Sequence, residues 1–129
     1  WTSRTGNTGP YLMYAYARTQ SILKEVGGST KGLQFTWNAL KQHAEHLLLV
    51  KLSQFPEVVE KASQRYEPQL LCIYLYELSK TFSSFYTQCP VLKAESESLR
   101  NTRLALVEFT GKTLDQGLNL LGIKTIKKM

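Results

Sequence analysis

The fold of this chain is decided by residues 97–129, ESLRNTRLALVEFTGKTLDQGLNLLGIKTIKKM. Apolar residues recur there at helical spacing, and at ~100° per residue they cover roughly half the circumference of one long helix. An apolar face that wide is typical of a helix held by neighbours on two sides, so we predict a central helix around which the others pack. The predicted apolar face is Leu99, Leu106, Phe109, Leu114, Gly117, Leu118 and Leu121, and the predicted polar face is Asn101, Glu108, Lys112, Asp115 and Asn119.

Local signals mark both ends of this helix. Ser96 is a favourable N-cap residue, because its side chain accepts a hydrogen bond from a free backbone N–H of the first turn. Gly122 supplies the left-handed conformation that ends many helices. A short basic tail with Lys124, Lys128 and Met129 follows. We expect the tail to lie at one end of the domain.

Four further helices are predicted upstream. Prolines 10, 56 and 68 open three of them, because proline is tolerated in the first helical turn. The connection GGSTKGLQFT is too rich in glycine for helix, and no strand-like alternation of useful length appears. The chain is therefore predicted to be an all-α, five-helix bundle in one domain, residues 1–129. The predicted segments are a linker at 1–9, helices at 10–26, 38–53, 56–67, 68–88 and 97–121, and a loop at 89–95; the buried stripe of the second helix is Leu40, Ala44, Leu47, Leu48 and Leu52.

The composition indicates a globular protein with a polyanionic partner. Sixteen basic residues against ten acidic ones give a net charge of +6, and nucleic acid is the first candidate, although such an excess also serves solubility alone. No apolar run approaches the ~20 residues of a membrane span, so no membrane partner is expected. Because the first residue is Trp1, we expect a piece of a longer protein. Cys72 and Cys89 match no metal or redox spacing and are interpreted as reduced thiols of a cytoplasmic protein.

Motifs for catalysis are absent from the sequence. It contains no glycine-rich phosphate loop, no GxSxG and no HExxH, so no catalytic residue and no cofactor are assigned to it. His43 and His46 could share one helix face, but no further ligand completes a metal site. Arg103 falls inside the apolar arc, where a guanidinium must be paired. We favour an internal ion pair or carbonyl contact there over a phosphate contact.

Tyrosines at the margins of apolar faces are the remaining candidates. Tyr11 and Tyr14, with Arg18 one turn further on, follow one edge of the first helix, and Tyr86 lies at the end of the fourth. An edge tyrosine packs its ring and keeps its hydroxyl wet, which needs no function. Rings beside cations are also what an unstacked RNA loop binds. Periodicity alone favours the first interpretation.

Three motifs carry a resemblance to a known family. The opening TGNTGPYLMYAYARTQSIL, the middle LLLVKLSQFPEVVEKASQRYEPQLLCIYLYELSKTFSSFYTQCPVL and the close TRLALVEFTGKTLDQGLNLLGIKTIKKM resemble, in the right order, the C-terminal DALR anticodon-binding domain of arginyl-tRNA synthetases. Two positions depart from the family pattern. Tyr16 stands where many members have histidine, and Pro90 stands where some have an aromatic residue.

The resemblance implies a function and a set of site residues. The whole enzyme would use ATP to join arginine to tRNA-Arg, with ATP bound in a catalytic domain that these residues do not contain. This domain would bind the anticodon loop, contact its own catalytic domain, and belong to a monomeric cytoplasmic enzyme. Carried over by motif, the tRNA-binding residues are Tyr11, Tyr14, Tyr86 and Met129; Arg18, Lys124 and Lys128 are added for their positions.

Two alternatives remain open. The chain could be a DALR-type relative that does not aminoacylate, or a helical protein-interaction module whose edge tyrosines serve packing. The anticodon-binding interpretation requires that the rings of the first and fourth helices and the last residue converge on one patch.

Overall fold

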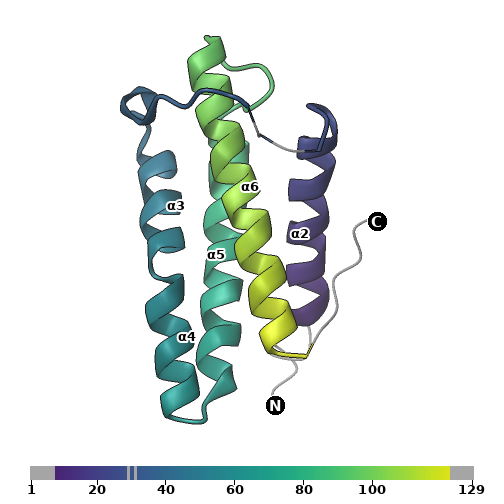
Figure 1. The fold of residues 1–129 in the computed structure, drawn as a ribbon, viewed down its shortest axis with the longest axis vertical. Helices are drawn as coiled ribbons and strands as arrows, with labels where there is room; N and C mark the ends of the chain where they lie inside the picture. The colour runs from purple at the N-terminus through teal and green to yellow at the C-terminus, as the bar shows by residue number, and fades with distance from the viewer. Residues whose placement is uncertain (1–7, 29, 31, 123–129) are drawn as a thin grey trace.

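The computed structural model describes residues 8–28, 30 and 32–122, and no strand occurs among them. The all-α class is therefore confirmed for this part of the chain. The long helices lie side by side along one axis (Figure 1). In chain order the elements are α2 (Thr8–Lys24), the 3-10 turn η1 (Trp37–Ala39), α3 (His43–Ser53), α4 (Phe55–Gln64), α5 (Pro68–Gln88) and α6 (Glu97–Leu120).

α6 is the central helix, as the sequence predicts. It packs against α2, α3, α5 and η1. Its first turn is capped by the Ser96 hydroxyl, which accepts a hydrogen bond from the Leu99 amide at 3.1 Å. At its other end Gly122 has φ 84° and donates to the Asn119 carbonyl at 3.0 Å. Both ends thus follow from local sequence signals.

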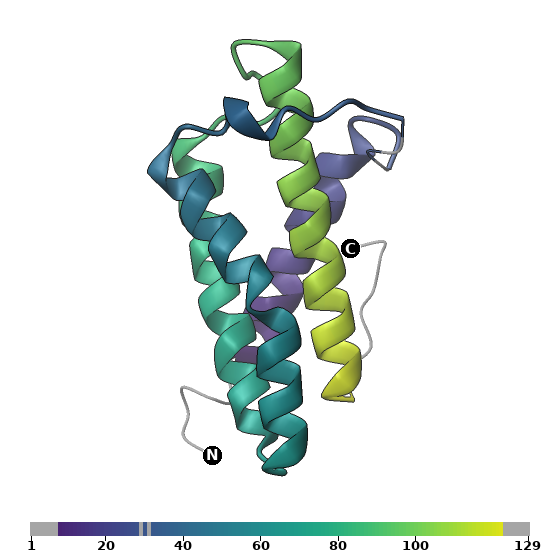
Figure 2. The same cartoon turned by 60° about the vertical axis from the view of Figure 1, so that its left-hand side comes forward.

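The predicted count of five helices is not confirmed, because two of the predicted helices stack as one interrupted rod. Gln54 alone separates α3 from α4 and serves as the C-cap of the first and the N-cap of the second. Figure 2 shows α3 and α4 end to end, beside α5. The proline at position 56 opens the second helix without turning the chain away.

The second predicted helix begins later than expected, and its inward face differs from the prediction at two positions. It starts at His43 rather than Asn38, because the Gln42 amide donates to the Glu45 carboxylate at 2.8 Å and so closes the first turn there. Glu45 is buried with Ala44 and Leu48, whereas the predicted core residue Leu47 is exposed. The predicted stripe is therefore confirmed at Leu40, Ala44 and Leu48, with Leu52 packed against the core, and it is wrong at Leu47. The burial of the Glu45 carboxylate was not predicted.

A buried ion pair joins α6 to α3. Arg103 Nε donates to Glu45 Oε2 at 2.5 Å, and its Nη1 donates to the Pro90 carbonyl at 2.7 Å. Both side chains are at least nine-tenths buried. The preferred interpretation of Arg103, an internal ion pair together with a carbonyl contact, is confirmed. Through it one guanidinium ties together three separate parts of the chain.

The predicted two faces of α6 fail at two positions, Asn101 and Phe109. Residues 101–107 are all buried, including the expected polar residue Asn101, whereas the expected core residue Phe109 is 49% exposed. The connection before α3 adds to the burial, because it lies across α6 (Figure 2). The Thr30 amide and hydroxyl both donate to the Glu108 carboxylate at 2.9 Å, and the Thr36 amide donates to Thr102 Oγ1 at 2.8 Å.

Candidate nucleic-acid interface

Three of the predicted RNA-binding residues meet on the surface between α2 and α5. Arg18 Cζ lies 5.0 Å from the ring centre of Tyr14 and 4.9 Å from that of Tyr86. An Arg18 Nη2 atom also donates to the Tyr14 hydroxyl at 2.8 Å. The rings remain accessible, with Tyr14 61% and Tyr86 40% exposed. We call these three residues the tyrosine–arginine cluster.

The cluster forms because both helices place it at the edge of their packed faces. Tyr14 and Arg18 are four residues apart on α2 and therefore lie one above the other. Their neighbours Ala15 and Thr19 are buried. On α5 the Tyr86 ring lies 6.3 Å from that of the buried Phe82. The ring is thus held by the core on one side and is open on the other.

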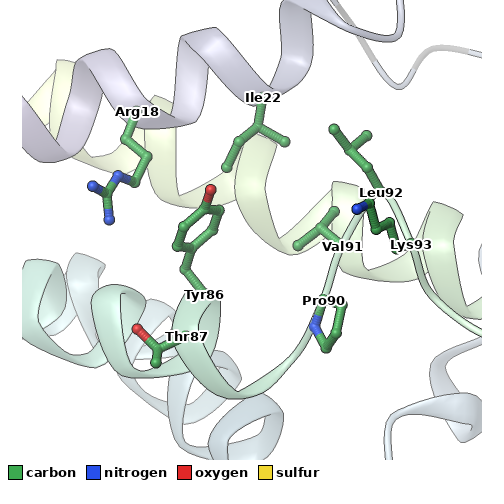
Figure 3. Close-up of a pocket in the computed structure, with 8 residues that line it drawn as sticks. All are labelled: Arg18, Ile22, Tyr86, Thr87, Pro90, Val91, Leu92 and Lys93. Atoms are coloured by element: carbon green, nitrogen blue, oxygen red, sulfur yellow. The ribbon is translucent and has the colours of Figure 1, made fainter.

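A pocket of about 540 Å³ opens beside the cluster. Figure 3 shows Arg18 and Tyr86 at one end, with α6 passing behind the cavity and the chain after α5 closing the other end. The lining combines an aromatic ring and aliphatic side chains with two cations and two hydroxyl groups. Its volume falls in the range usual for small-molecule sites. The lining residues are Arg18, Ile22, Tyr86, Thr87, Pro90, Val91, Leu92 and Lys93.

Tyr11 does not join the cluster. Its ring packs on Tyr76 of α5, with centroids 5.3 Å apart, and it is partly buried against the core. Lys80 Nζ lies 5.4 Å from the other ring of this pair. Tyr11 therefore borders a second, smaller aromatic and cationic contact one helical turn from Tyr14.

The tail residues of the predicted site lie outside the described residues. This applies to Lys124, Lys128 and Met129. The predicted convergence can therefore be examined only for the two helices, where Tyr14 and Tyr86 come together at Arg18 and Tyr11 does not join them.

The loop side of the pocket was missed by sequence reasoning. Lys93 and Leu92 follow α5 in the predicted loop and showed no periodicity that would assign them to a site. A cation a few residues after the last tyrosine of a helix is a weak signal that could have indicated Lys93. Pro90, noted as a departure from the family pattern, also lines the pocket.

Other candidate chemistry receives no support from the described residues. Among them no three histidine, cysteine or acidic side chains gather where they could hold a metal ion. No helix in this part of the chain has the length and hydropathy needed to cross a membrane. Cys72 and Cys89 are free thiols, as expected, and burial raises the pKa of each.

The family follows from comparison with known sequences. Residues 12–129 match the family described as the DALR anticodon binding domain, and the chain belongs to that family. Within it, the chain is 48% identical over 124 residues to an arginine–tRNA ligase of Haemophilus influenzae (strain 86-028NP), which covers 96% of this chain and 22% of that protein. An arginine–tRNA ligase of Stutzerimonas stutzeri is 45% identical over 126 residues. The predicted resemblance to arginyl-tRNA synthetases is confirmed.

Solved structures agree with this assignment. The arginyl-tRNA synthetase of Thermus thermophilus matches with a TM-score of 0.84 and 34% identity over 94% of this chain and 21% of that one. A putative arginyl-tRNA synthetase from Campylobacter jejuni has the same TM-score at 22% identity, which shows the shared fold. The chain spans about a fifth of the length of the curated relatives it matches.

Proposed function

We propose that this chain is the anticodon-binding domain of an arginine–tRNA ligase and binds the anticodon loop of tRNA-Arg. The family, the names of its relatives and the net charge of +6 support the proposal. The whole enzyme would join arginine to tRNA-Arg using ATP, with ATP held by a catalytic domain that contacts this one. As part of the same proposal, the enzyme is cytoplasmic and monomeric.

The observation that carries the proposal is the position of Arg18 between two accessible tyrosine rings beside a pocket. An unstacked base needs a flat aromatic surface, and its phosphate needs a cation. Tyr86 offers the ring at the mouth of the pocket, and Arg18 and Lys93 offer the positive charge. We infer that one base of the loop stacks on Tyr86 and enters the pocket.

The other predicted residues take supporting roles in this proposal. Tyr14 holds Arg18 through its hydroxyl and presents the more exposed ring, so a neighbouring base could stack on it. Tyr11 contributes at the margin of the surface. Lys124, Lys128 and Met129 are proposed to contact the loop from the tail.

A titration with two anticodon stem-loops tests the proposal. The two RNAs differ only in the middle anticodon base, cytosine or uracil, and we expect tighter binding with cytosine. Base–aromatic stacking contributes about 1–3 kcal/mol, so Tyr86→Ala should weaken binding by roughly one to two decades. Tyr66→Ala is the matched control, because that ring is 91% exposed and lies after α4.

Equal affinity for both stem-loops, together with no effect of Tyr86→Ala, would contradict the proposal. That outcome would favour protein interaction, for which one surface offers support. The rings of Phe35, Trp37 and Phe109 are all exposed and lie 6.0 and 6.5 Å apart in succession. They lie where η1 packs on α6. Gly111 of α6 faces α2, and Phe109 is about 200° around the helix from it, so these rings lie on the side of α6 away from α2.

A further inference from the structure

A second pocket lies where the loop after α5 meets the starts of α3 and α6. Its volume is about 330 Å³. We propose that it binds a backbone phosphate of the same RNA whose base occupies the pocket beside Tyr86. This inference rests on the proposed function, because it takes an RNA as the ligand. The polar and charged side chains of its lining are Lys41, Gln42, Glu45, Gln88, Lys93, Glu95 and Arg103.

The first step of the argument is the unused donor of Arg103. Nε is bonded to Glu45 and Nη1 to the Pro90 carbonyl, and Nη2 has no hydrogen-bond partner among the described residues. In that part of the chain, the fully buried side-chain polar atoms that lack a hydrogen-bond partner are Ser79 Oγ and Asn101 Oδ1. Arg103 Nη2 is not among them, so it is not fully buried. Arg103 Nη2 therefore keeps access to the pocket that the residue lines. A fixed guanidinium with a free N–H edge is a strong phosphate donor.

The second step is the charge around that donor. The Glu45 carboxylate is already occupied, since one oxygen accepts from Arg103 and the other from the Gln42 amide. Of the other charged side chains in the lining, Lys41 and Lys93 are exposed and so is Glu95. These three side chains give the mouth of the pocket a net charge of one positive unit. An anion is therefore favoured over a cation, and Glu95 weakens its binding.

The third step is continuity with the first pocket. Pro90 and Lys93 line both cavities, so a single loop forms the wall between them. A nucleotide that stacks on Tyr86 has its phosphates at the pocket mouth, and a neighbouring phosphate can pass over this loop. Lys93 would then contact the RNA where its backbone passes from one pocket to the other. This path predicts a contact to RNA on the α3 side of the loop, away from the tyrosine–arginine cluster.

Direct binding is measured by NMR on the chain labelled with 15N-arginine. The guanidinium signals of Arg103 should shift and saturate on titration with inorganic phosphate and with the anticodon stem-loop, whereas those of the exposed Arg65 after α4 should not saturate. A stem-loop that moves the signals of Arg18, which lies beside the Tyr86 ring, but leaves Arg103 unmoved would overturn the phosphate site while leaving the proposed function intact. Saturation by phosphate alone, with no response to the stem-loop, would also overturn it, because the site would then bind a free anion and not RNA.

Matched charge variants provide the second arm. The plot of log affinity against log salt has a negative slope. Lys41→Gln and Lys93→Gln should each make this slope shallower by about 0.7, the effect of losing one phosphate contact on a single-stranded RNA. Glu95→Gln should raise the affinity. The controls are Lys61→Gln and Glu57→Gln, an exposed ion pair on α4 that removes the same charges far from the loop.

The two arms separate the two claims. A normal cytosine preference with salt slopes equal to those of the controls would overturn the phosphate site alone. Loss of the cytosine preference with a reduced slope for Lys41→Gln would overturn the anticodon reader and leave an RNA phosphate site. The expected result is that Lys41→Gln lowers the affinity for RNA and Glu95→Gln raises it, each by more than its control variant.

Discussion

Arg103 shows how one residue can fix the arrangement of several elements. Its guanidinium contacts Glu45 of α3 and the backbone of Pro90, and it is itself part of α6. Sequence alone could predict that this arginine needs a partner, since it falls inside an apolar arc. It could not identify Glu45, because that partner lies 58 residues away and its own helix face looks like a leucine stripe.

Replacing Arg103 with Met should strongly destabilise the fold. The Glu45 carboxylate would remain buried without its cation, and breaking a buried pair in this way typically costs about 3–5 kcal/mol. Urea unfolding followed by circular dichroism measures the loss. In the double variant Arg103→Met, Glu45→Leu, most of the stability should return. An unchanged urea midpoint for Arg103→Met would contradict the structural role.

Tyr66 is a residue whose backbone conformation is unfavourable for its type. Its φ is 53°, the only positive value outside glycine in the described residues. It stands after α4, where its amide donates to the Ser63 carbonyl and the Glu67 amide donates to the Ala62 carbonyl. This is the hydrogen-bond pattern that glycine usually completes at a helix end.

Tyr66→Gly should therefore stabilise the chain by up to about 1 kcal/mol. The left-handed conformation costs a side-chain-bearing residue about 1–2 kcal/mol, and glycine loses part of that gain through its greater freedom when unfolded. Thermal unfolding measures the effect. The control Tyr66→Ala keeps a Cβ and should show no such gain, and a destabilised glycine variant would contradict the account.

At the scale of elements, α2 and α5 pack closely on α6 because α6 has a glycine at its contact with each of them. A Cβ at Gly111 would come within 2.7 Å of Thr19 Oγ1 on α2, and one at Gly117 within 2.7 Å of the Leu75 methyl groups on α5. Both partner side chains are fully buried. These glycines lower the intrinsic helix propensity but let the neighbouring helices approach.

Gly117→Ala should destabilise the bundle in spite of the better helix propensity of alanine. The gain of about 1 kcal/mol from propensity is opposed by about 1–3 kcal/mol for overpacking a close-packed contact. Thermal melting of Gly117→Ala against Asn119→Ala, an exposed site on the same helix, separates the two effects. A Gly117→Ala variant that melts higher than the parent chain would show that Leu75 can move aside.

Element boundaries were predictable where a local signal sets them. Pro68 begins α5, Ser96 caps α6 and Gly122 ends it, each through a contact within a few residues. The later start of α3 and the burial around the first half of α6 were not predictable. Both depend on contacts across the fold: Glu45 with Arg103, and Thr30 with Glu108.

At the scale of the whole molecule, the core should protect the thiol of Cys89. Burial raises the pKa of Cys89, with Arg103 opposing and Glu45 adding to the shift, and the side chain is fully buried. Because the folded pKa is raised, this thiol favours the folded state below its unfolded pKa. That contribution is lost as the pH rises through the folded value.

Labelling of Cys89 should therefore report unfolding. In a Cys72→Ala chain at pH 8, reaction with a thiol reagent should be slow under native conditions and accelerate across the urea transition. Matching midpoints for labelling and for circular dichroism would support a cooperative core. Rapid labelling without urea would contradict the burial of this thiol.

The candidate site was partly predictable at this scale. Tyr14, Arg18 and Tyr86 were expected from edge positions and from family resemblance, and the packing of α2 on α5 brings them together. Lys93 and Leu92 were not, because a loop position carries no periodicity. The pocket they complete exists only once the loop after α5 folds back beside α2 (Figure 3).

Photocrosslinking tests the central claim most directly. An anticodon stem-loop with 5-iodocytidine in the middle position links to an aromatic ring on which that base stacks, and mass spectrometry identifies the residue. We predict a crosslink at Tyr86. The crosslink should persist in the Tyr86→Phe variant, because the aromatic ring remains. A link at Trp37 or Phe109, on the other side of α6, would contradict the proposed reader.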